Sequence, residues 1–513
     1  MQADPATGEP VVIGVDLGTT ATKAVAFDAA GGSWGDAAAE YPLQTTEPGW
    51  AVQDPEAVVA AALSAIREAA VATRERGALV KGLCFSAALH SLVGLDARSR
   101  PLTPIITWAD GRAGEQSERL RAAEGGLALH GRTGTPMHPM SPLPKLVWFR
   151  EQEPRLFEAA CAWVGIKELV LMRLCGQRAV DHSVASGTGL LNLAALDWDA
   201  EALDLAGIDA GRLSPLVPAT HLMDGGLMPA AADVVGLPAN TPIVIGAGDG
   251  PLANLGIGAV RPGVAACSIG TSGALRVMVE RPSVDPLGRV FCYALTERRW
   301  VVGGAINNGG VVLQWTGDAL APELGSGSEL ELLELAARAP AGSGGLLMMP
   351  ALLSERAPHW SPLPRGAYVG LTRAHRREHL VRAALEGVCL QLALVLRSMR
   401  DAGNDVHEIR ATGGFAQSPL WRQMLTDALG MEIGYPAGHE GSSFGAALLG
   451  MQVLGLVESV DVAADLVRIE DVTRPDPVAA AVYEALLAPF GELHDALAPT
   501  FEALRRIEPT LPE

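Results

Sequence analysis

Aromatic residues and cysteines are scarce in this sequence. Only 5% of the 513 residues are aromatic, and the six cysteines lie far apart with no CxxC pair. This pattern argues against a disulfide-stapled fold and indicates free thiols in a reducing cytoplasm. A long hydrophobic run is also missing. The longest helix-like apolar stretch, residues 383–396, contains Glu386 and Gln391 and is shorter than the roughly 20 residues of a membrane span.

The first residues predict no secretory signal. The first ten residues include Asp4 and Glu9 and contain no apolar core of the kind that a secretory signal needs. We therefore expect a soluble cytoplasmic protein.

Positively charged residues are also few compared with acidic residues. Lysine and arginine together number 39 against 58 aspartates and glutamates, which gives a formal net charge of −19. Such a field repels polyanions, so we expect neither nucleic acid nor an anionic membrane as a partner. If the ligand is itself an anion, the chain must supply local positive features, such as helix N-termini or a few placed Lys and Arg residues.

The sequence does contain a repeated pattern within an ordinary globular composition. The strand Val11–Asp16, a Gly/Thr-rich turn and a second strand, Thr22–Phe27, have a counterpart in Ala265–Val279, about half a chain later. The repeat predicts a duplicated α/β domain with a cleft between its halves. We place the domains at 1–242 and 243–513, with the helical and loop-rich residues 112–198 as an inserted substrate region.

Both turns contain groups suited to an anion. In Asp16-Leu-Gly-Thr-Thr-Ala-Thr-Lys23 a carboxylate at a strand end precedes small residues whose N–H and hydroxyl groups can reach phosphate oxygens, and a lysine follows. The segment is not a P-loop, because the second glycine before the lysine is missing. With the matching Gly270-Thr-Ser-Gly273, two such turns facing one cleft could hold a polyphosphate from both sides.

Further motifs complete a resemblance to the FGGY carbohydrate kinases of the actin-like superfamily. They are Gly246-Ala-Gly-Asp-Gly250, Gly303-Gly-Ala-Ile-Asn-Asn-Gly-Gly310 before Gln314-Trp315, and Ala411-Thr-Gly-Gly-Phe-Ala-Gln-Ser-Pro-Leu-Trp421. The resemblance implies two actin-like (ribonuclease H-like) domains with an interdomain cleft, and ATP and Mg²⁺ as cofactors. The residues implied for ATP binding are Gly18, Thr19, Thr20, Lys23, Gly270, Thr271, Ser272, Gly310, Gln314, Gly413, Gly414, Phe415 and Gln417.

The same resemblance implies the reacting groups. Asp249 matches the family's catalytic base, and a carboxylate near the attacking hydroxyl is what phosphoryl transfer requires. Asp16, together with Asp249, would orient Mg²⁺. The sugar site implied by the resemblance consists of Leu89, His90, Trp108, Asp110, Arg112, His138 and Asp249.

Each sugar-site residue type suits a polyol. Asp110 offers hydrogen-bond acceptors, His90 a donor, and Trp108 an aromatic wall for the C–H face. Leu89 stands where the family more commonly has Met, which leaves the polar contact of the next residue intact.

The choice of sugar depends on finer similarity. Thr133–Lys145, Ser354–Trp360 and Ile106–Asp110 resemble the gluconokinase branch more than the xylulokinase branch. We therefore expect phosphorylation of a terminal hydroxyl of an open-chain sugar acid, D-gluconate to 6-phosphogluconate, with a pentulose or other polyol kinase as the alternative. The substrate carboxylate calls for a nearby cation or several N–H donors, and the candidates, which the sequence does not rank, are His138, Lys145, Arg112 and His182.

Three other functions deserve comparison. The pattern GxSxG of acyl hydrolases occurs at 31–35 and 441–445, but neither copy has the required tight strand-to-helix elbow. His375 and His379 have a zinc-compatible spacing without a third ligand. A non-kinase actin-like ATPase would lack the sugar-site residues. The sequence does not report oligomeric state, and a homodimer stays open.

Overall fold

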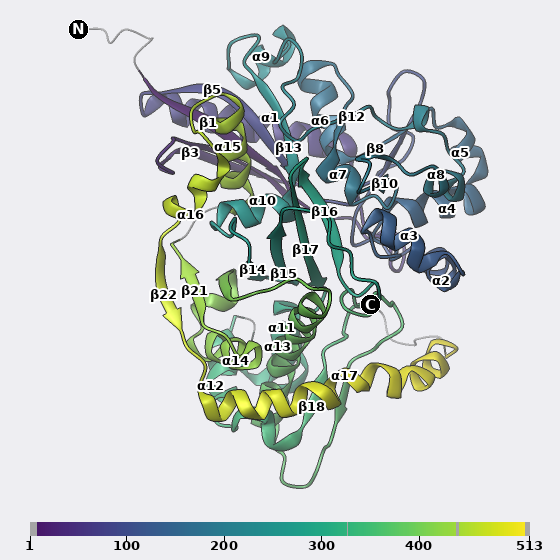
Figure 1. Ribbon diagram of the computed structural model, residues 1–513, viewed down its shortest axis with the longest axis vertical. Coiled ribbons are helices and arrows are strands. Elements are labelled where there is room, and N and C mark those ends of the chain that lie inside the picture. The colour runs from purple at the N-terminus through teal and green to yellow at the C-terminus, as the bar shows by residue number, and fades with distance from the viewer. Residues whose placement is uncertain (1–7, 326, 438–440, 508–513) are drawn as a thin grey trace.

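The computed structural model describes residues 8–325, 327–437 and 441–507, which fold into two lobes (Figure 1). The first lobe contains a five-stranded sheet in the order β13-β5-β1-β2-β3. Its strands are β1 (Glu9–Leu17), β2 (Ala21–Phe27), β3 (Ser33–Glu40), β5 (Ala78–Ala87) and β13 (Ile243–Gly248).

The second lobe, drawn mostly in green and yellow in Figure 1, contains a seven-stranded sheet in the order β16-β17-β15-β14-β20-β21-β22. Its strands are β14 (Val264–Ile269), β15 (Gly273–Val279), β16 (Phe291–Thr296), β17 (Arg299–Ile306), β20 (Glu408–Thr412), β21 (Ile433–Pro436) and β22 (Ile469–Thr473).

The two sheets repeat one topology. In the first, β1 pairs antiparallel with β2, β2 antiparallel with β3, and β5 parallel with both β1 and β13. In the second, β14, β15, β17, β20 and β21 pair in the same directions and the same order. The predicted two-lobed, actin-like α/β fold is therefore confirmed, and the two Gly/Thr turns occupy equivalent hairpins.

Strand β1 shows how the sheet separates two cores. Val11, Ile13 and Val15 face a core that includes α1 (Pro55–Glu75), whereas Val12 faces a core shared with α10 (Asp249–Gly256) and α15 (Gly441–Val453). This is the two-residue alternation of a strand covered on both sides. Asp54 caps α1 by accepting hydrogen bonds from the N–H groups of Glu56 and Ala57.

Helix α15 belongs to the second half of the sequence but packs on the first sheet. A Cβ atom at Gly445 would lie 2.0 Å from the Leu252 carbonyl oxygen, and one at Gly14 would lie 1.9 Å from that of Ser443. A Cβ on Gly256 of α10 would likewise lie 1.7 Å from the Gly441 carbonyl oxygen, whereas a Cβ on Gly441 would make only ordinary contacts. The close packing of α15 on α10 therefore explains the second glycine of the GxSxG pattern at 441–445.

The predicted domain boundary falls inside the first lobe. Ile243 and Val244 of β13 pair with Leu83 and Cys84 of β5, so a division at 242/243 separates this strand from its own sheet. Pairing between strands that are distant in sequence is not visible in local patterns.

The inserted region has a hydrophobic core of its own, which includes Leu143, Leu146, Phe149 and Trp163. Its helices are α2 (Gly114–Ala122), α3 (Gly126–Thr133), α4 (Pro142–Gln152), α5 (Pro154–Ala159), α6 (Ile166–Cys175), α7 (His182–Ser186) and α8 (Ala200–Ala206). The short strand pairs nearby are β4 (Val52–Gln53) with β7 (Ile105–Ile106), β6 (Val93–Leu95) with β8 (Ala162–Val164), β9 (Val180–Asp181) with β12 (Leu216–Val217), and β10 (Leu191–Asn192) with β11 (Asp197–Trp198). Helix α9 (Pro229–Val235) lies against α1.

Helix α13 (Arg377–Asp401) is the one helix among the described residues that is long and apolar enough to cross a membrane. The apolar stretch 383–396 was judged too short for a membrane span because Glu386 and Gln391 interrupt it, but the helix that contains it has 25 residues. The helix lies within the protein core, with 83% of its most apolar window buried. Glu386 accepts hydrogen bonds from Arg382 at 2.7 Å and from the Tyr483 hydroxyl at 2.7 Å. A buried carboxylate paired in this way is typical of a globular core.

The segment after Pro475 forms the helix α17 (Pro477–Arg505). Its Tyr483 and Phe490 are buried against Leu390 and Leu394 of α13. The remaining elements of the second lobe are α11 (Gly310–Leu320), α12 (Glu329–Ala336), α14 (Pro419–Leu429), α16 (Ala463–Leu466), β18 (Leu347–Met349) and β19 (Ala367–Val369).

Candidate active site

A cavity of about 290 Å³ lies where the two lobes meet. Both lobes line it, because the first contributes side chains from its hairpin turn, the loops after β5 and β7, and the start of α10. The second contributes side chains from β15, β16 and the loop that follows β18. The polar and aromatic lining residues include Thr19, His90, Trp108, Asp249, Arg276, Tyr293, Arg356 and Trp360.

Asp249 is half-buried at the first position of α10, directly after β13. Burial, together with the negative charge of Asp16, raises its pKa to about 6. The Gly250 N–H, which donates to Oδ1 at 2.7 Å, and the Arg276 guanidinium act in the opposite direction. The carboxyl group is thus mostly ionised at neutral pH and poised to take up a proton.

Asp16 is half-buried near the end of β1 and is held by two hydroxyl groups. Ser86 of β5 donates to Oδ1 at 2.6 Å, and Ser442 of α15 donates to Oδ2 at 2.7 Å. The carboxylate is therefore fixed from both the sheet and the helix packed on it. Lys23 faces solvent from β2 at the position paired with Asp16.

The first hairpin turn is joined to the sugar-site loop. Trp108 donates its indole N–H to the Thr19 hydroxyl at 2.8 Å, and the Tyr41 hydroxyl donates to the Gly18 carbonyl at 2.7 Å. Thr19 lines the cavity, whereas Thr20 is exposed beside it. The structure thus brings the predicted phosphate turn and the predicted aromatic wall into direct contact.

The second hairpin turn lies against the start of α11. The Gly310 N–H donates to the Gly270 carbonyl at 2.6 Å, and the Gly309 N–H donates to the Thr271 carbonyl at 3.1 Å. Ser272 reaches the cavity. Gln314 is exposed on α11, one turn farther along the helix.

The 413–417 turn adjoins the same hairpin. Gly413 has φ of 112°, and a Cβ there would lie 2.2 Å from the Ile269 carbonyl oxygen. Only glycine fits this close approach. Gly414 and Gln417 are exposed, but the Phe415 ring is buried edge-on against Trp421, with 6.2 Å between ring centroids. Phe415 thus packs in the core, and only its backbone is placed to face a ligand.

His90 has a defined tautomer. Its Nδ1 lies 2.6 Å from the Gly187 carbonyl oxygen, and since a carbonyl only accepts, Nδ1 carries the proton. Burial lowers the His90 pKa to about 3, helped by the charge of Lys145. The neutral ring therefore offers Nε2 as an acceptor, which corrects the donor role expected from the sequence. Leu89 lines the cavity beside it.

Asp110 and Arg112 do not line the cavity. The Arg112 Nε donates to Asp110 Oδ1 at 2.7 Å, and the Ala51 N–H donates to Oδ2 at 2.8 Å. The guanidinium lies 3.6 Å from the centroid of the Trp50 ring. This buried pair supports the loop that carries Trp108, so the direct sugar contacts expected of these two residues are not seen.

The other candidates for the substrate carboxylate are also occupied or displaced. Lys145 donates to the carbonyls of His90, Thr107 and Met140 at 2.6–2.8 Å. His138 packs edge-on against Trp360 behind the cavity wall, with 6.0 Å between ring centroids. Lys145, His138 and His182 are all absent from the cavity lining.

Two arginines that the sequence prediction did not include do line it. Arg276 of β15 lies 3.2 Å from Asn254 of α10 and 3.3 Å from the Ser268 hydroxyl. Arg356 lies in the loop after β18, with its guanidinium carbon 4.8 Å from the Trp108 ring centroid. A lone cation within the apolar strand 273–279 was the sequence signal available for Arg276.

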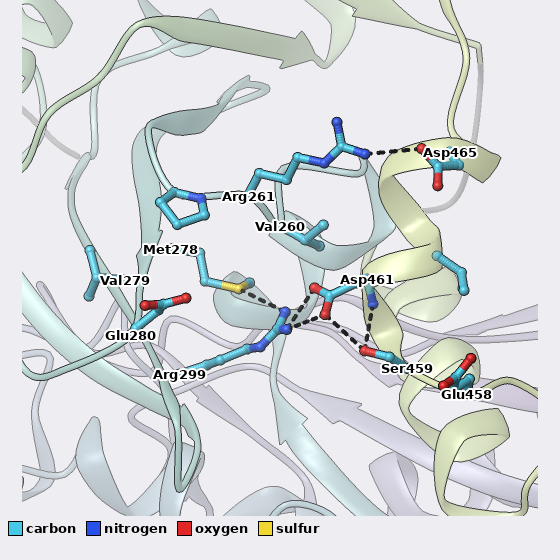
Figure 2. Close-up of a pocket in the computed structure, with 12 residues that line it drawn as sticks. Val260, Arg261, Met278, Val279, Glu280, Arg299, Glu458, Ser459, Asp461 and Asp465 are labelled. Atoms are coloured by element: carbon cyan, nitrogen blue, oxygen red, sulfur yellow. Dashed lines mark hydrogen bonds and ion pairs between the residues drawn. The ribbon is translucent and has the colours of Figure 1, made fainter.

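A second cavity, of about 430 Å³, lies elsewhere in the second lobe (Figure 2). Figure 2 shows that its two arginines form ion pairs: Arg261 with Asp465 at 3.1 Å, and Arg299 with Asp461 at 2.6 Å. None of the site residues predicted from the sequence lines it.

The zinc-compatible histidines serve the local backbone. His375 Nδ1 accepts from the Thr372 N–H at 2.9 Å, and His379 Nδ1 accepts from the Arg376 N–H at 3.2 Å. Both contacts stabilise the start of α13.

Comparison with known proteins assigns the family. The N-terminal domain of the FGGY family of carbohydrate kinases matches residues 11–256, and its C-terminal domain matches residues 265–453. The gluconokinase of Bacillus subtilis is 40% identical over 93% of this chain and 94% of its own, and the xylulose kinase of that species is 31% identical over 88% and 90%. Crystal structures of gluconate kinase and xylulose kinase from Lactobacillus acidophilus both give a TM-score of 0.91 at 33% identity, covering 96% of this chain and 99% and 100% of theirs. The chain belongs to the FGGY family of carbohydrate kinases.

Proposed function

We propose that this kinase transfers the γ-phosphoryl group of ATP to the terminal hydroxyl of D-gluconate, giving 6-phosphogluconate. The observation that carries the proposal is the interlobe cavity, in which Asp249 shares the space with the guanidinium groups of Arg276 and Arg356. A sugar acid needs a base at its reacting hydroxyl and a positive environment for its carboxylate. The greater identity to a gluconokinase than to a xylulose kinase supports the same choice.

In the proposed reaction, Asp249 accepts the proton of the attacking hydroxyl. A pKa near 6 suits this role, because the group is ionised at neutral pH yet basic enough to accept a proton. Arg276 lies beside the base and would stabilise the negative charge on the phosphoryl group. His90 Nε2 would accept a hydrogen bond from a sugar hydroxyl, and Trp108 would cover the C–H face of the sugar.

The nucleotide would lie between the hairpins. The Thr19-Thr20 and Thr271-Ser272 turns, with Lys23, would contact the phosphates from both lobes. Gly310 and Gln314 of α11, the backbone at 413–415 and Gln417 would contact the adenosine.

The residues present fit a divalent cation. The charge of Asp16 raises the pKa of Asp249, so a cation near both carboxylates would relieve their repulsion. Mg²⁺ is commonly held by one or two carboxylates together with substrate phosphates. When bound, it would neutralise charge on the transferred group, while Ser86 and Ser442 keep Asp16 in place.

The test is a coupled ADP-release assay with Mg²⁺-ATP and a panel of gluconate, xylulose, ribulose and glycerol. We expect kcat/KM to be highest for gluconate. A preference for xylulose or ribulose would contradict the gluconate proposal and favour the pentulose alternative. No stimulation by any sugar would contradict both.

The cytoplasmic location and a homodimer stay predictions. Five of the six free cysteines are buried and Cys161 is exposed, an arrangement that suits a reducing compartment. Fractionation of the native cells and sedimentation of the purified protein test the two statements separately.

A further inference from the structure

The cavity contains an arginine whose hydrogen-bonding capacity is largely unused. Arg356 is only 9% exposed, and one Nη donates to the Ile306 carbonyl at 3.0 Å. Within the described residues its buried Nε has no hydrogen-bond partner. A guanidinium has five N–H donors, and leaving buried donors unpaired is costly. The side chain therefore has donors to offer to a ligand.

The neighbours of Arg356 hold it in place without neutralising it. The Trp108 ring lies under the guanidinium at 4.8 Å, a contact that fixes the plane of the group. The adjacent Glu355 accepts hydrogen bonds from the Asn307 N–H at 3.0 Å, the Asn308 amide at 2.9 Å and the Arg356 N–H at 2.8 Å. Its carboxylate is thus bound mainly by backbone and amide donors.

The electrostatics of the cavity differ from those of the whole chain. The charge of Arg356 contributes to lowering the pKa values of His90 and His138, after burial, so both rings are neutral. Arg276, the second guanidinium of the cavity, lies beside the base at the start of α10. In a chain of net charge −19, the cavity therefore has two cations, Arg276 beside the base and Arg356 against the Trp108 ring.

We propose that Arg356 binds the carboxylate of the sugar-acid substrate and determines the preference for an acid over a neutral polyol. This inference rests on the proposed function, since it names the group that recognises the charged end of gluconate. Arg356 and Asp249 line the same cavity, so one open-chain substrate can meet the guanidinium at one end and the base at the other. Planar, bidentate contact with a carboxylate is the chemistry for which a guanidinium is suited.

The experiment compares gluconate with D-glucitol, which has the same carbon chain and a hydroxymethyl group in place of the carboxylate. In R356M, kcat/KM for gluconate should fall about 10- to 150-fold, the range of a charge-assisted hydrogen bond, whereas kcat/KM for glucitol should change little. R356K keeps the positive charge but not the planar set of N–H donors. Its kcat/KM for gluconate should therefore fall less than that of R356M. An unchanged gluconate-to-glucitol ratio in R356M would overturn the proposal.

Two controls separate this role from folding and from the proposed function. Arg121 donates to the Trp360 carbonyl in the same loop, so R121M should disturb the loop and lower kcat/KM for both substrates by a similar factor. A selective loss for gluconate in R121M as large as in R356M would contradict the role of Arg356. If R356M does not fold, R356K takes its place in the test. An unchanged ratio of kcat/KM for gluconate to kcat/KM for glucitol in R356K then overturns the inference. If the wild-type enzyme does not phosphorylate gluconate, the proposed function itself is refuted. If the wild type prefers gluconate but R356M lowers kcat/KM equally for gluconate and glucitol, only this inference is refuted.

Discussion

At the scale of single residues, Asp249 lies between groups that push its pKa in opposite directions. Burial and the charge of Asp16 raise it, while the Gly250 N–H and Arg276 lower it, and the balance is a pKa of about 6. The same balance has a cost, because a carboxylate whose pKa is raised by folding destabilises the folded state when it is ionised. Activity and stability should therefore respond oppositely to this residue.

The pH dependence of the reaction should reveal Asp249. Only the ionised carboxylate can accept the hydroxyl proton, so kcat/KM for gluconate should be level above about pH 7 and fall roughly tenfold per pH unit well below pH 6. Initial rates in overlapping buffers at constant ionic strength would measure this decrease of kcat/KM at acidic pH. A profile that stays flat down to pH 5 would contradict the role of Asp249.

Replacing the base should separate catalysis from folding. In Asp249→Asn, turnover should fall at least about 100-fold because the proton acceptor is lost, while ATP binding should persist. The raised pKa means that the wild-type residue loses folding stability as pH rises from its unfolded value near 4 through about 6. The variant should thus have a higher Tm than wild type at pH 7.5, with the difference shrinking towards pH 5. A lower Tm at pH 7.5 would show that the lost activity reflects misfolding.

At the scale of elements, local sequence patterns predicted most of the framework. The β1–β2 and β14–β15 hairpins form near the expected bounds, because apolar strand residues flank a Gly/Thr-rich turn in each. The sheet partner of β13 and the burial of Phe415 depend on contacts between distant segments. Resemblance identified Asp249, but it could not show that Asp110 and Arg112 bind each other instead of lining the cavity.

The crossing of α10 and α15 gives an element-scale prediction. In Gly445→Ala the new Cβ would lie 2.0 Å from the Leu252 carbonyl, so the helices must separate, and we expect a loss of roughly 1–3 kcal/mol in the free energy of unfolding. Activity should fall as well, because α15 carries Ser442, which holds Asp16. Denaturant unfolding and the ADP-release assay measure the two effects.

The matched control is Gly131→Ala in α3, where a Cβ would meet nothing within 4 Å. That substitution should stabilise the protein by about 0.5–1 kcal/mol, because alanine favours a helix over glycine. Equal stability changes in the two variants would contradict the packing explanation for this GxSxG segment.

At the scale of the whole molecule, the site exists only where the two lobes meet. The base follows the last strand of the first sheet, whereas Arg276, Ser272 and Arg356 come from the second lobe. Polar contacts also join the lobes away from the base, since the Cys292 N–H donates to the Gly134 carbonyl at 2.9 Å and Arg505 pairs with Glu118 at 3.1 Å. No local pattern could predict which side chains such a junction brings together.

A site divided between two lobes predicts closure on substrate binding. Closing the lobes over both substrates would exclude water and limit wasteful hydrolysis of ATP. Small-angle scattering of Asp249→Asn, whose slow turnover should leave both substrates bound for longer, should show a smaller radius of gyration with Mg²⁺-ATP and gluconate together than with either alone. The same measurement with glucitol in place of gluconate tests whether the carboxylate contributes to closure. An unchanged radius in the ternary complex would contradict lobe closure, and the exclusion of water would then have to come from the side chains of the cavity alone.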